Sequence, residues 1–415
     1  MIELKEYFLD ELYKMESGIS TKPEQAGHGS PFVSFSSIYN NAILPEELLD
    51  LMDTSEEEQK RYSVKEGDIF LTRTSETLDE LAMSSVAVKD YPNATFSGFA
   101  KRLRPIQSDI TYAKFMAFFM RSNYFRKIIN CKAVMTLRAS FNEEIFSYIK
   151  VELPGYEHQK KCGDLFYAIE QKIRNNNKIN AELDAMAKTI YDYWFLQFEF
   201  PNDEGKPYKS SGGKMVWNEE LKREIPAGWR VGNLYNIAEF INGLPCQKFR
   251  PISNNKLPVI KIAEMHEGIT GKTEWARTDV PEKNIILDGD IIFSWSATLE
   301  AMVWSGGKAV LNQHIFKVIP KSFPKSYVFM QLSAYIINFV KMAEARKTTM
   351  GHITVDHLKQ SKIVIPFLNV VGKFDNTIKT NFEKMINLNV ENRELEALRD
   401  FLLPLLMNGQ VGFKE

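Results

Sequence analysis

The feature that most constrains the fold of this chain is a short sequence phrase that occurs twice. EGDIFLTR at residues 66–73 returns as DGDIIFSW at residues 288–295, an offset of 222 in a chain of 415 residues. Neighbouring segments align as well, since PFVSFSSI at 31–38 corresponds to PVIKIAEM at 258–265, at an offset of 227. Self-similarity of this kind predicts two related structural units rather than a single one.

The order of the segments that follow the phrase is also the same in both halves. The helical run at 111–130 corresponds in type to the run at 326–345. NAELDAM at 180–186 corresponds to NRELEAL at 392–398, at an offset of 212. The offset therefore changes slowly along the chain, as short insertions in loops would make it do. We infer an internal duplication, in a chain long enough for two to four domains.

Each copy ends in a segment with the apolar spacing of a long helix. One interpretation is an amphipathic helix that covers its own domain, but two matched segments favour pairing with one another in a coiled coil. Asn180 and Asn392 occupy equivalent positions in the two stripes, where a polar residue typically fixes the register. The stripes, with alternating steps of three and four, are Ile173, Asn176, Asn180, Leu183, Ala187, Ile190 and Trp194, and Met385, Leu388, Asn392, Leu395, Arg399, Leu402 and Leu406.

The globular part of each half is predicted to mix strands and helices. Short segments such as IIFSW and HIFKVI are separated by glycine-containing turns and amphipathic runs. In the first half, Ser140 and Glu143 have the spacing of a capping box, which predicts a short helix before the strand YIKVEL. The predicted fold class is α+β, with two mixed α/β domains in a pseudo-twofold repeat, separated by two long antiparallel coiled-coil helices. The predicted segments are a first domain at 1–154, a central long helix at 155–199, a Gly-, Pro- and Ser-rich connection at 200–229, a second domain at 230–366 and a C-terminal long helix at 367–415.

Composition and charge narrow the possible partners and compartment. The net charge is −1, so a nucleic-acid surface would have to be local. Three scattered cysteines, Cys131, Cys162 and Cys246, do not form a disulfide framework and indicate a reducing cytoplasm. The most apolar stretch, 327–340, is too short and too polar to span a bilayer, and the N-terminus does not resemble a signal peptide. We expect a cytoplasmic protein without a membrane partner.

Several short motifs resemble chemical sites but lack a required residue. GITGKT at 268–273 ends like a phosphate-binding loop, but His266 stands where the motif needs its first glycine. FSGFA at 96–100 lacks the second glycine of a methyl-donor loop, and no Asn-Pro-Pro-aromatic or Asp-Pro-Pro-aromatic tetrapeptide occurs in the chain. His352 and His357 are poorly spaced for a metal site. The sequence therefore predicts no catalytic residues, no bound cofactor and no metal in this chain.

Longer blocks carry a resemblance to a known family. REIPAGWRVGNLYNIAEFINGLP at 223–245 and GDIIFSWSATLEAMVWSGGKAVLNQHIFKVIP at 289–320 resemble blocks of type I restriction–modification specificity subunits. YDYWFLQFEFP at 191–201 and LLPLLMNGQV at 402–411 are similar to later blocks of the same family. The resemblance covers essentially the whole chain, in the family's order of recognition domain, helix, recognition domain and helix.

This resemblance implies a function and a set of partners. Such a subunit is the non-catalytic, sequence-specific DNA-reading component of a larger complex, and each target-recognition domain reads one half of a bipartite, asymmetric target in double-stranded DNA. The partners that it implies are two methyltransferase subunits, which methylate adenine, and restriction subunits, which translocate and cleave DNA. S-adenosylmethionine, ATP and magnesium would then belong to those partners. Two similar readers on a pseudo-twofold frame can address two groove segments of one duplex.

Two other classes of function remain open at the level of sequence. One is a coiled-coil scaffold protein without a nucleic-acid role, since long matched helices alone would serve such a protein. The other is a DNA methyltransferase whose catalytic motifs are not recognisable in the sequence.

Candidate DNA contacts follow from the chemistry of recognition. Phosphate contacts need Lys or Arg on loops, whereas base reading favours Arg on guanine and Asn or Gln on adenine. A lone surface Lys or Arg is usually just solvated, and Asn312 and Gln313 could instead cap a strand end. The candidates are Arg73, Thr74, Lys101, Arg102, Arg104 and Arg138 in the first domain, and Lys248, Arg250, Lys308, Asn312, Gln313, Arg346, Lys347 and His352 in the second.

Overall fold

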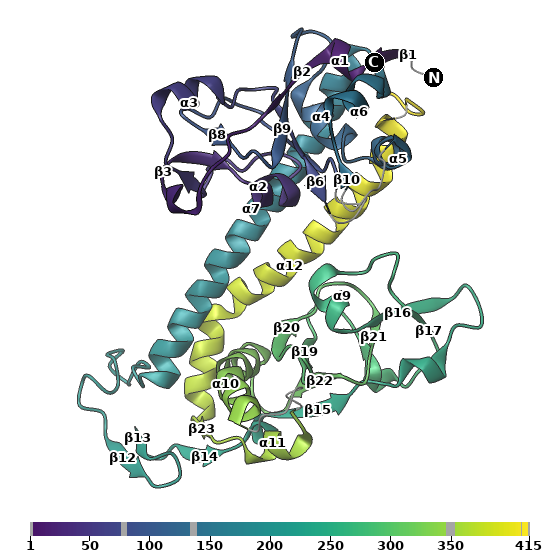
Figure 1. The fold of residues 1–415 in the computed structure, drawn as a ribbon. Coiled ribbons are helices and arrows are strands. Elements are labelled where there is room, and N and C mark those ends of the chain that lie inside the picture. The colour runs from purple at the N-terminus through teal and green to yellow at the C-terminus, as the bar shows by residue number, and fades with distance from the viewer. Residues whose placement is uncertain (1–2, 76–80, 133–138, 346–352, 408, 414–415) are drawn as a thin grey trace. The chain divides into compact units, whose positions relative to one another are not determined.

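The structure is a computed structural model that describes residues 3–75, 81–132, 139–345, 353–407 and 409–413 (Figure 1). The chain divides into two compact units. Unit 1 comprises Met1–Ile173 and Leu395–Glu415, and unit 2 comprises Arg174–Glu394. Each unit therefore contains one globular domain together with part of each long helix, α7 (Tyr156–Tyr191) and α12 (Leu368–Met407).

Unit 1 is built on a four-stranded antiparallel sheet with the order β2-β9-β5-β7. A smaller sheet, β4-β3-β8, contains one parallel pair, β3–β8. The elements are β1 (Leu4–Phe8), α1 (Leu9–Leu12), β2 (Tyr13–Ser17), β3 (Ala26–Val33), α2 (Phe35–Asn40), β4 (Leu51–Met52), α3 (Glu56–Arg61), β5 (Ile69–Thr72), β6 (Thr74–Ser75), β7 (Ser84–Val86), β8 (Thr95–Phe96), β9 (Ala100–Pro105), α4 (Ala113–Phe119), α5 (Asn123–Lys132), β10 (Ala139–Ser140), α6 (Glu143–Tyr148) and β11 (Lys150–Pro154).

Unit 2 repeats this plan. Its antiparallel sheet has the order β15-β22-β19-β20, and its second sheet, β17-β16-β21-β18, again contains one parallel pair, β16–β21. The elements are β12 (Met215–Asn218), β13 (Arg223–Pro226), β14 (Arg230–Gly232), α8 (Leu234–Ile237), β15 (Ala238–Asn242), β16 (Lys256–Ile260), α9 (Ile262–Glu267), β17 (Trp275–Arg277), β18 (Ile285–Ile286), β19 (Ile291–Ser294), β20 (Glu300–Val303), β21 (Ala309–Leu311), β22 (Ile315–Pro320), α10 (Lys325–Ala345), α11 (Val355–Gln360) and β23 (Ile363–Ile365).

The phrase that occurs twice in the sequence forms the same turn in both units, directly before strands β5 and β19. Gly67 and Gly289 adopt φ values of 86° and 88°, which disfavour a side chain. The carboxylates of Asp68 and Asp290 each accept a hydrogen bond from the backbone N–H three residues earlier, at 2.8 Å in both units. The repeated phrase is therefore a structural turn that leads into a central strand.

The turn aspartate also binds a cation on the neighbouring strand. Arg104 of β9 donates Nε and Nη2 to the fully buried Asp68 at 2.7 and 2.6 Å. Lys317 of β22 lies 2.9 Å from Asp290. Because these pairs join the turn to a neighbouring strand, they fix the start of the central strand in each sheet.

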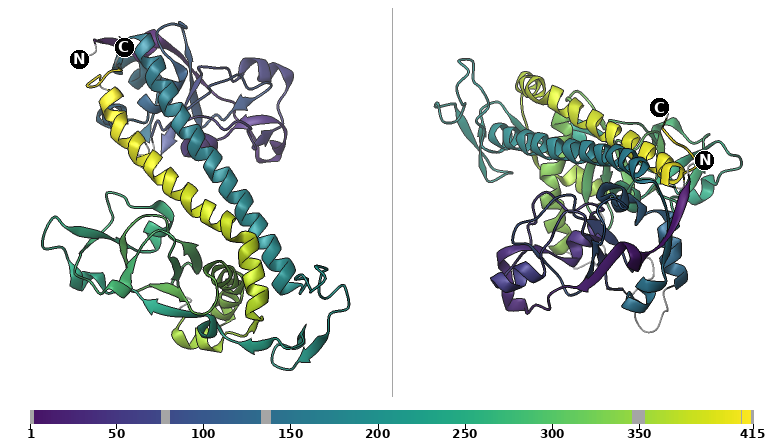
Figure 2. Two further views of the ribbon diagram at one scale, coloured as in Figure 1. Left: turned by 180° about the vertical axis from the view of Figure 1, so that it is seen from behind. Right: turned by 90° about the horizontal axis from the view of Figure 1, so that it is seen from above.

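The predicted pairing of the two long helices is confirmed, and it is antiparallel in each unit (Figure 2). In unit 2, Asn180 of α7 donates a hydrogen bond to Asn389 of α12 at 2.6 Å. In unit 1, Arg399 of α12 lies 3.5 Å from Glu170 of α7, so the cation within the second stripe is neutralised by the partner helix.

The ends of both helices also cover the globular cores. In unit 1, Leu406 and Met407 of α12 lie in the same apolar cluster as Phe166 of α7. In unit 2, Phe374 and Ile378 of α12 belong to the main core. The interpretation of each helix as a cover for a globular domain therefore holds at the helix ends, alongside the pairing.

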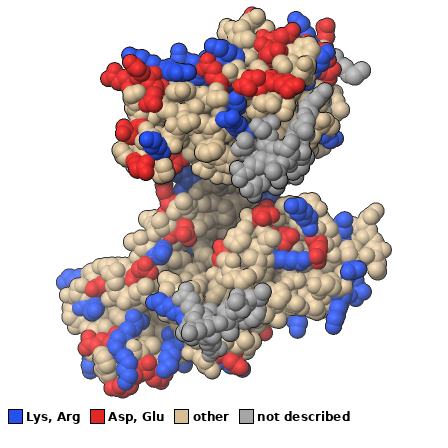
Figure 3. All heavy atoms as spheres, viewed as in Figure 1, with Lys and Arg blue, Asp and Glu red and all other residues tan. Residues whose placement is uncertain are grey.

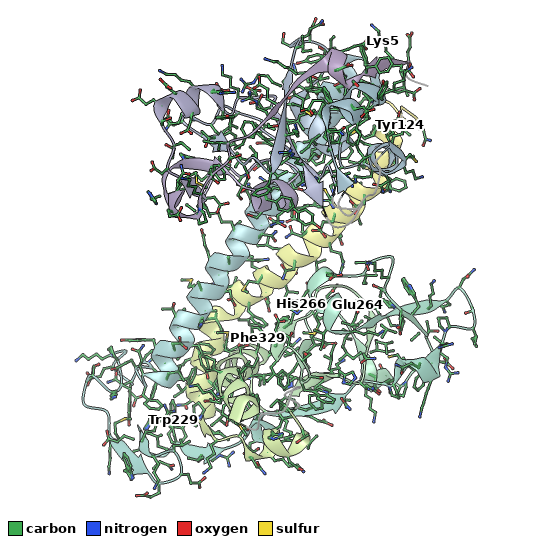
Figure 4. The ribbon with its side chains drawn as sticks, viewed as in Figure 1. Lys5, Tyr124, Trp229, Glu264, His266 and Phe329 are labelled. Carbon is green, nitrogen blue, oxygen red and sulfur yellow. The ribbon has the colours of Figure 1, made fainter. Side chains whose placement is uncertain are left out.

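Two of the family-like sequence blocks meet in an aromatic core of unit 2. Residues 191–201 begin at the last residue of α7, and residues 225–229 are IPAGW. The ring of Trp229 stacks on Phe200 with centroids 4.9 Å apart and meets Phe198 edge-on at 5.8 Å (Trp229 is labelled in Figure 4). Phe198, Phe200 and Trp229 are buried and are therefore packing residues.

Two local predictions need correction. The helix before YIKVEL is confirmed as α6, but its N-cap is Asn142, which accepts the backbone N–H of Ile145 at 2.9 Å, so the capping box at Ser140 was wrong. The run at 111–130 is divided into α4 and α5, whereas α10 is continuous. Ser122 accepts the backbone N–H of Phe125 at the start of α5, which favours a new helix there.

Among the described residues, no helix combines the length and the apolar character needed to cross a bilayer.

Candidate nucleic-acid interface

Each globular domain carries the same sharp turn just before strand β9 or β22. We call these turns the twin turns; they comprise residues 96–99 in unit 1 and 311–314 in unit 2. Ser97 N donates to the carbonyl of Val33 at 3.0 Å, and the corresponding residue of unit 2, Asn312, donates to Ile260 at 3.0 Å. The sequence offset that aligned residues 31–38 with 258–265 relates these two acceptors. The main chain of both turns is thus held in the same way.

The chain that leaves the central strand is tied to the twin turn in both units. Arg73 N donates to the carbonyl of Phe99 at 2.9 Å, and Trp295 N donates to the carbonyl of His314 at 3.2 Å. These bonds place the residue after β5 or β19 beside the last residue of the turn.

A buried polar side chain caps each turn from inside. Phe99 N donates to Ser97 Oγ at 3.2 Å, and His314 N donates to Asn312 Oδ1 at 3.3 Å. Ser97 and Asn312 are both buried. Asn312 therefore takes the strand-end capping role that was the alternative to a DNA contact.

A glycine in the neighbouring strand end allows the close approach of the chains. A Cβ atom on Gly18 would lie 2.2 Å from the carbonyl oxygen of Ser97, and one on Gly243 would lie 2.1 Å from that of Asn312. Real Cβ atoms do not approach a carbonyl oxygen this closely, so only glycine fits at either position. The frame of the twin turns thus depends on backbone contacts that both units share.

The side chains that project from this common frame differ between the units. In unit 1, Arg73 is exposed, and the Phe99 side chain is 69% exposed. In unit 2, the rings of Trp295 and His314 lie 5.3 Å apart, and both are half-buried. Trp295 donates its indole N–H to Asn242 Oδ1 at 3.2 Å. One frame therefore presents a cation beside an aromatic ring in unit 1 and an aromatic pair in unit 2.

Four predicted contacts of the first domain lie on strands rather than on loops, and three of these are on β9. Lys101, Arg102 and Arg104 are consecutive or alternate residues of β9, an inner strand of its sheet. Lys101 is buried and lies 2.7 Å from Glu143, and the buried Arg102 pairs with Glu16. The predicted loop placement of these residues was wrong, because the inner strand is covered and its cations are paired within the protein.

Burial and ion pairing shift the pKa values of two of these cations. Burial lowers the pKa of Arg102. Hydrogen bonding to the Asp68 carboxylate raises the pKa of Arg104. The raised pKa of Arg104 indicates that its pair with Asp68 stabilises the charged side chain in the folded protein, whereas the lowered pKa of Arg102 reflects the cost of burying that cation.

The other predicted contacts differ in exposure. Arg73 is exposed, and so are Lys248, Arg250 and Lys308 in unit 2. Gln313 is half-buried, and its side-chain nitrogen lies 3.3 Å from His314 Nε2. Thr74 is part of strand β6, which pairs with β10. Arg138, Arg346, Lys347 and His352 lie outside the described residues.

His357, one of the two histidines weighed as metal ligands, has a local partner, and the other, His352, lies outside the described residues. His357 is buried and its Nδ1 accepts the backbone N–H of Thr354 at 2.9 Å, at the start of α11. His266 of α9, which stands in place of the first glycine of the phosphate-loop pattern (labelled in Figure 4), lies 3.2 Å from Glu300. Within the described parts of the chain, no group of three or more His, Cys, Asp or Glu residues is arranged to hold a metal ion.

Sequence reasoning missed Phe99, Trp295 and His314. A signal for them was present, because the offset of 222 that aligns the repeated phrase places Arg73 opposite Trp295. The smaller offset of 215, which the strand register Ile69↔Leu103 and Ile291↔Val318 requires, places Phe99 opposite His314. The register could not be known before the strands were paired.

Comparison with known proteins identifies the family. The family model described as "Type I restriction modification DNA specificity domain" matches residues 1–185 and 226–398. The specificity subunit of the type I restriction enzyme MjaIX of Methanocaldococcus jannaschii is 26% identical over 80% of this chain and 76% of its own length. The specificity subunit of the HindI enzyme of Haemophilus influenzae is 21% identical over 92% of this chain and 94% of its own length.

The fold agrees with these matches. The crystal structure of the S subunit of a type I restriction–modification system from M. genitalium superimposes with a TM-score of 0.62, covering 98% of this chain and 96% of that one, at 12% identity. The predicted fold of two mixed α/β domains with two long helices is thereby confirmed. The scaffold and methyltransferase alternatives find no support. Because the family model matches both halves of the chain, this protein belongs to the family of type I restriction–modification DNA specificity subunits.

Proposed function

We propose that each globular domain of this specificity subunit reads one half of a bipartite, asymmetric DNA target. The observation that carries the proposal is the pair of twin turns. Their backbones are held by equivalent hydrogen bonds, but the side chains differ. The turns carry Phe99 in one domain and His314 in the other, and the strand ends bonded to them carry Arg73 and Trp295. Two readers with a common frame and different side chains recognise different base sequences.

The charge distribution supports local rather than chain-wide attraction to DNA. On the face shown in Figure 3, basic and acidic side chains are interspersed on each unit. The net charge of −1 gives no general attraction to a polyanion. The exposed candidates for phosphate contacts are Arg73, Lys248, Arg250 and Lys308. A few phosphate contacts would give a moderate dependence of affinity on salt concentration.

The partners are proposed from the family. The relatives are specificity subunits of restriction enzymes, which by name work with other subunits. We infer that this chain assembles with two methyltransferase subunits and with restriction subunits, and that it directs adenine methylation or cleavage without catalysing either reaction. S-adenosylmethionine, ATP and magnesium then belong to the partners. Because the substrate is cellular DNA, the complex would act in the cytoplasm.

The first experiment separates recognition from catalysis. The purified chain alone is expected neither to methylate nor to cleave DNA, and a methyltransferase subunit is expected to co-purify from the native cell. Methylated adenines mapped across the genome should then share one bipartite sequence. Turnover by a homogeneous preparation of the chain alone, or methylation without a common sequence, would contradict the proposal.

The second experiment tests the division of the target. Replacing residues 230–366 by the corresponding domain of a relative should change one half-site of the methylated sequence and leave the other unchanged. The reciprocal replacement of residues 1–154 serves as the matched control and should change the opposite half-site. Independent reading is wrong if either replacement alters both half-sites.

A further inference from the structure

We propose that the side chains at positions 73 and 99 contact bases of one half-site and that those at positions 295 and 314 contact bases of the other. This inference rests on the proposed function and names the residues that carry it. Of the four, only Arg73 was apparent from the sequence; the other three emerge from the geometry of the twin turns.

The main chain holds the four residues in fixed positions. The main chain at all four residues is fixed by hydrogen bonds, including Phe141 N to the carbonyl of Arg73 at 2.9 Å and the equivalent Ile353 N to that of Trp295 at 3.0 Å. Base reading requires side chains on such a rigid frame, since an error of about 0.5 Å weakens directional contacts. None of the bonds that hold the frame comes from the four side chains themselves. Their chemistry can therefore change between the units while the frame stays constant.

The two side chains of unit 1 have the chemistry of base contacts. Arg73 presents a guanidinium, the group that most often forms paired hydrogen bonds with O6 and N7 of guanine. Phe99, whose carbonyl accepts the Arg73 N–H, is 69% exposed, and the fold gains little from a ring in that position. Contact with a thymine methyl group or with an unstacked base would bury this ring. A phosphate contact would not, because an apolar ring offers no donor to a phosphate.

Unit 2 offers different groups at the same positions. His314 and the neighbouring Gln313 carry both donors and acceptors, as adenine recognition requires. The indole of Trp295 is held at one end by Asn242 and packs beside the His314 ring. The exposed cation of unit 1 is replaced here by an aromatic ring. The two half-sites are accordingly expected to differ in base composition at the contacted positions.

The experiment uses the full chain in complex with its co-purified methyltransferase subunit. Binding is selected from a library of duplexes with both half-sites randomised, and the enriched sequences are determined. The variants are Arg73→Ala/Phe99→Ala for unit 1 and His314→Ala for unit 2. Exposed residues of matched type serve as controls, namely Arg61→Ala with Leu49→Ala in unit 1 and His266→Ala in unit 2.

The unit 1 variant is expected to lose about tenfold or more in discrimination at one or more bases of a single half-site, with the other half-site unchanged. His314→Ala should do the same at the opposite half-site, and the controls should enrich the wild-type sequence. Thermal melting shows whether a variant folds, and the milder variants Arg73→Lys and His314→Gln repeat the measurement if one does not.

An unchanged enriched sequence in both sets of variants overturns the inference while leaving the proposed function intact. So does a uniform loss of affinity for every duplex, which would indicate phosphate contacts alone. A wild-type complex that enriches no sequence would instead overturn the proposed function, and the inference with it.

Discussion

Asn180 of α7 donates a hydrogen bond from Nδ2 to Oδ1 of Asn389 on α12 at 2.6 Å. The equivalent bond, from Asn392 to Asn177, measures 2.8 Å. The repeat offset of 212 relates Asn180 to Asn392 and Asn177 to Asn389, so the two bonds are copies of one another. The internal duplication is therefore visible in the contacts of the helix pair as well as in the globular domains. Hydrogen-bonded asparagines between helices specify one register, because a shifted pairing would leave amides unpaired.

Asn176 is the most buried member of this polar layer, and its removal should destabilise the helix pair. Its Nδ2 donates to Asn392 and to Glu391, both at 2.8 Å. Asn176→Ala would leave the buried Asn392 oxygen without this donor and should lower the free energy of unfolding by about 1–3 kcal/mol. Urea denaturation followed by circular dichroism measures the change. Asn177→Ala is the matched control. Because Asn177 is exposed, water can replace its side-chain oxygen as the acceptor for Asn392 Nδ2. A loss of unfolding free energy as large as that of Asn176→Ala would contradict this prediction.

The turn aspartates should differ in their contribution to stability. Asp68 is fully buried and is bonded twice to Arg104, whereas Asp290 is about a quarter exposed beside Lys317. Asp68→Ala leaves a partly buried arginine without its carboxylate and should destabilise unit 1 by about 3 kcal/mol. Asp290→Ala should have a smaller effect, since solvent already screens that pair. Thermal melting of both variants measures the loss. Equal decreases in melting temperature for Asp68→Ala and Asp290→Ala would show that burial does not control the strength of these pairs.

Two carboxylates, Glu16 and Glu143, should make unit 1 sensitive to acid. Hydrogen bonding from Lys14, with the charge of Arg102, lowers the pKa of Glu16 below its ordinary value of 4.5. Hydrogen bonding from Lys101 likewise lowers the pKa of Glu143. A lowered folded-state pKa means that the stabilisation is complete above pH about 4.5 and is lost as pH falls through the folded-state value.

Glu16→Gln and Glu143→Gln should therefore flatten the loss of stability below pH about 4.5, while the stability at neutral pH decreases. Melting temperatures measured between neutral and acidic pH test this. The exposed Glu47→Gln serves as the control and should reproduce the wild-type profile. A wild-type slope in both variants would mean that other carboxylates dominate the acid response.

The close approach at the twin turns predicts a strong effect of a single methyl group. Gly243→Ala would place Cβ 2.1 Å from the carbonyl oxygen of Asn312, so the strand end and the turn must separate. We expect a loss of stability of about 1–3 kcal/mol and weaker discrimination at one half-site only. Gly271→Ala, where no atom lies within 4 Å of the added Cβ, should be nearly neutral. Thermal melting and competition binding with altered half-sites measure the two effects.

The sequence alone determined the architecture of this protein. Three patterns can be recognised without knowing which distant segments are in contact. They are the repeat of EGDI and DGDI, the order of the neighbouring segments and the seven-residue spacing of the long helices. They were sufficient to predict two related domains, two paired helices and the family. The helix pairing was predictable because Asn180 and Asn392 occupy equivalent positions in two stripes of the same apolar spacing.

Only the tertiary structure decided which side chains face the solvent. Arg102 and Arg104 were predicted on a loop, but they pair with Glu16 and Asp68, which lie 86 and 36 residues away in the sequence. Phe99 lies beside Arg73 only because strands β5 and β9 pair in one particular register. Period-two patterns show which faces a strand has, but not what covers them. The physical reason is that strand register and burial arise from contacts between segments that are distant in the sequence. Local sequence patterns do not specify those contacts.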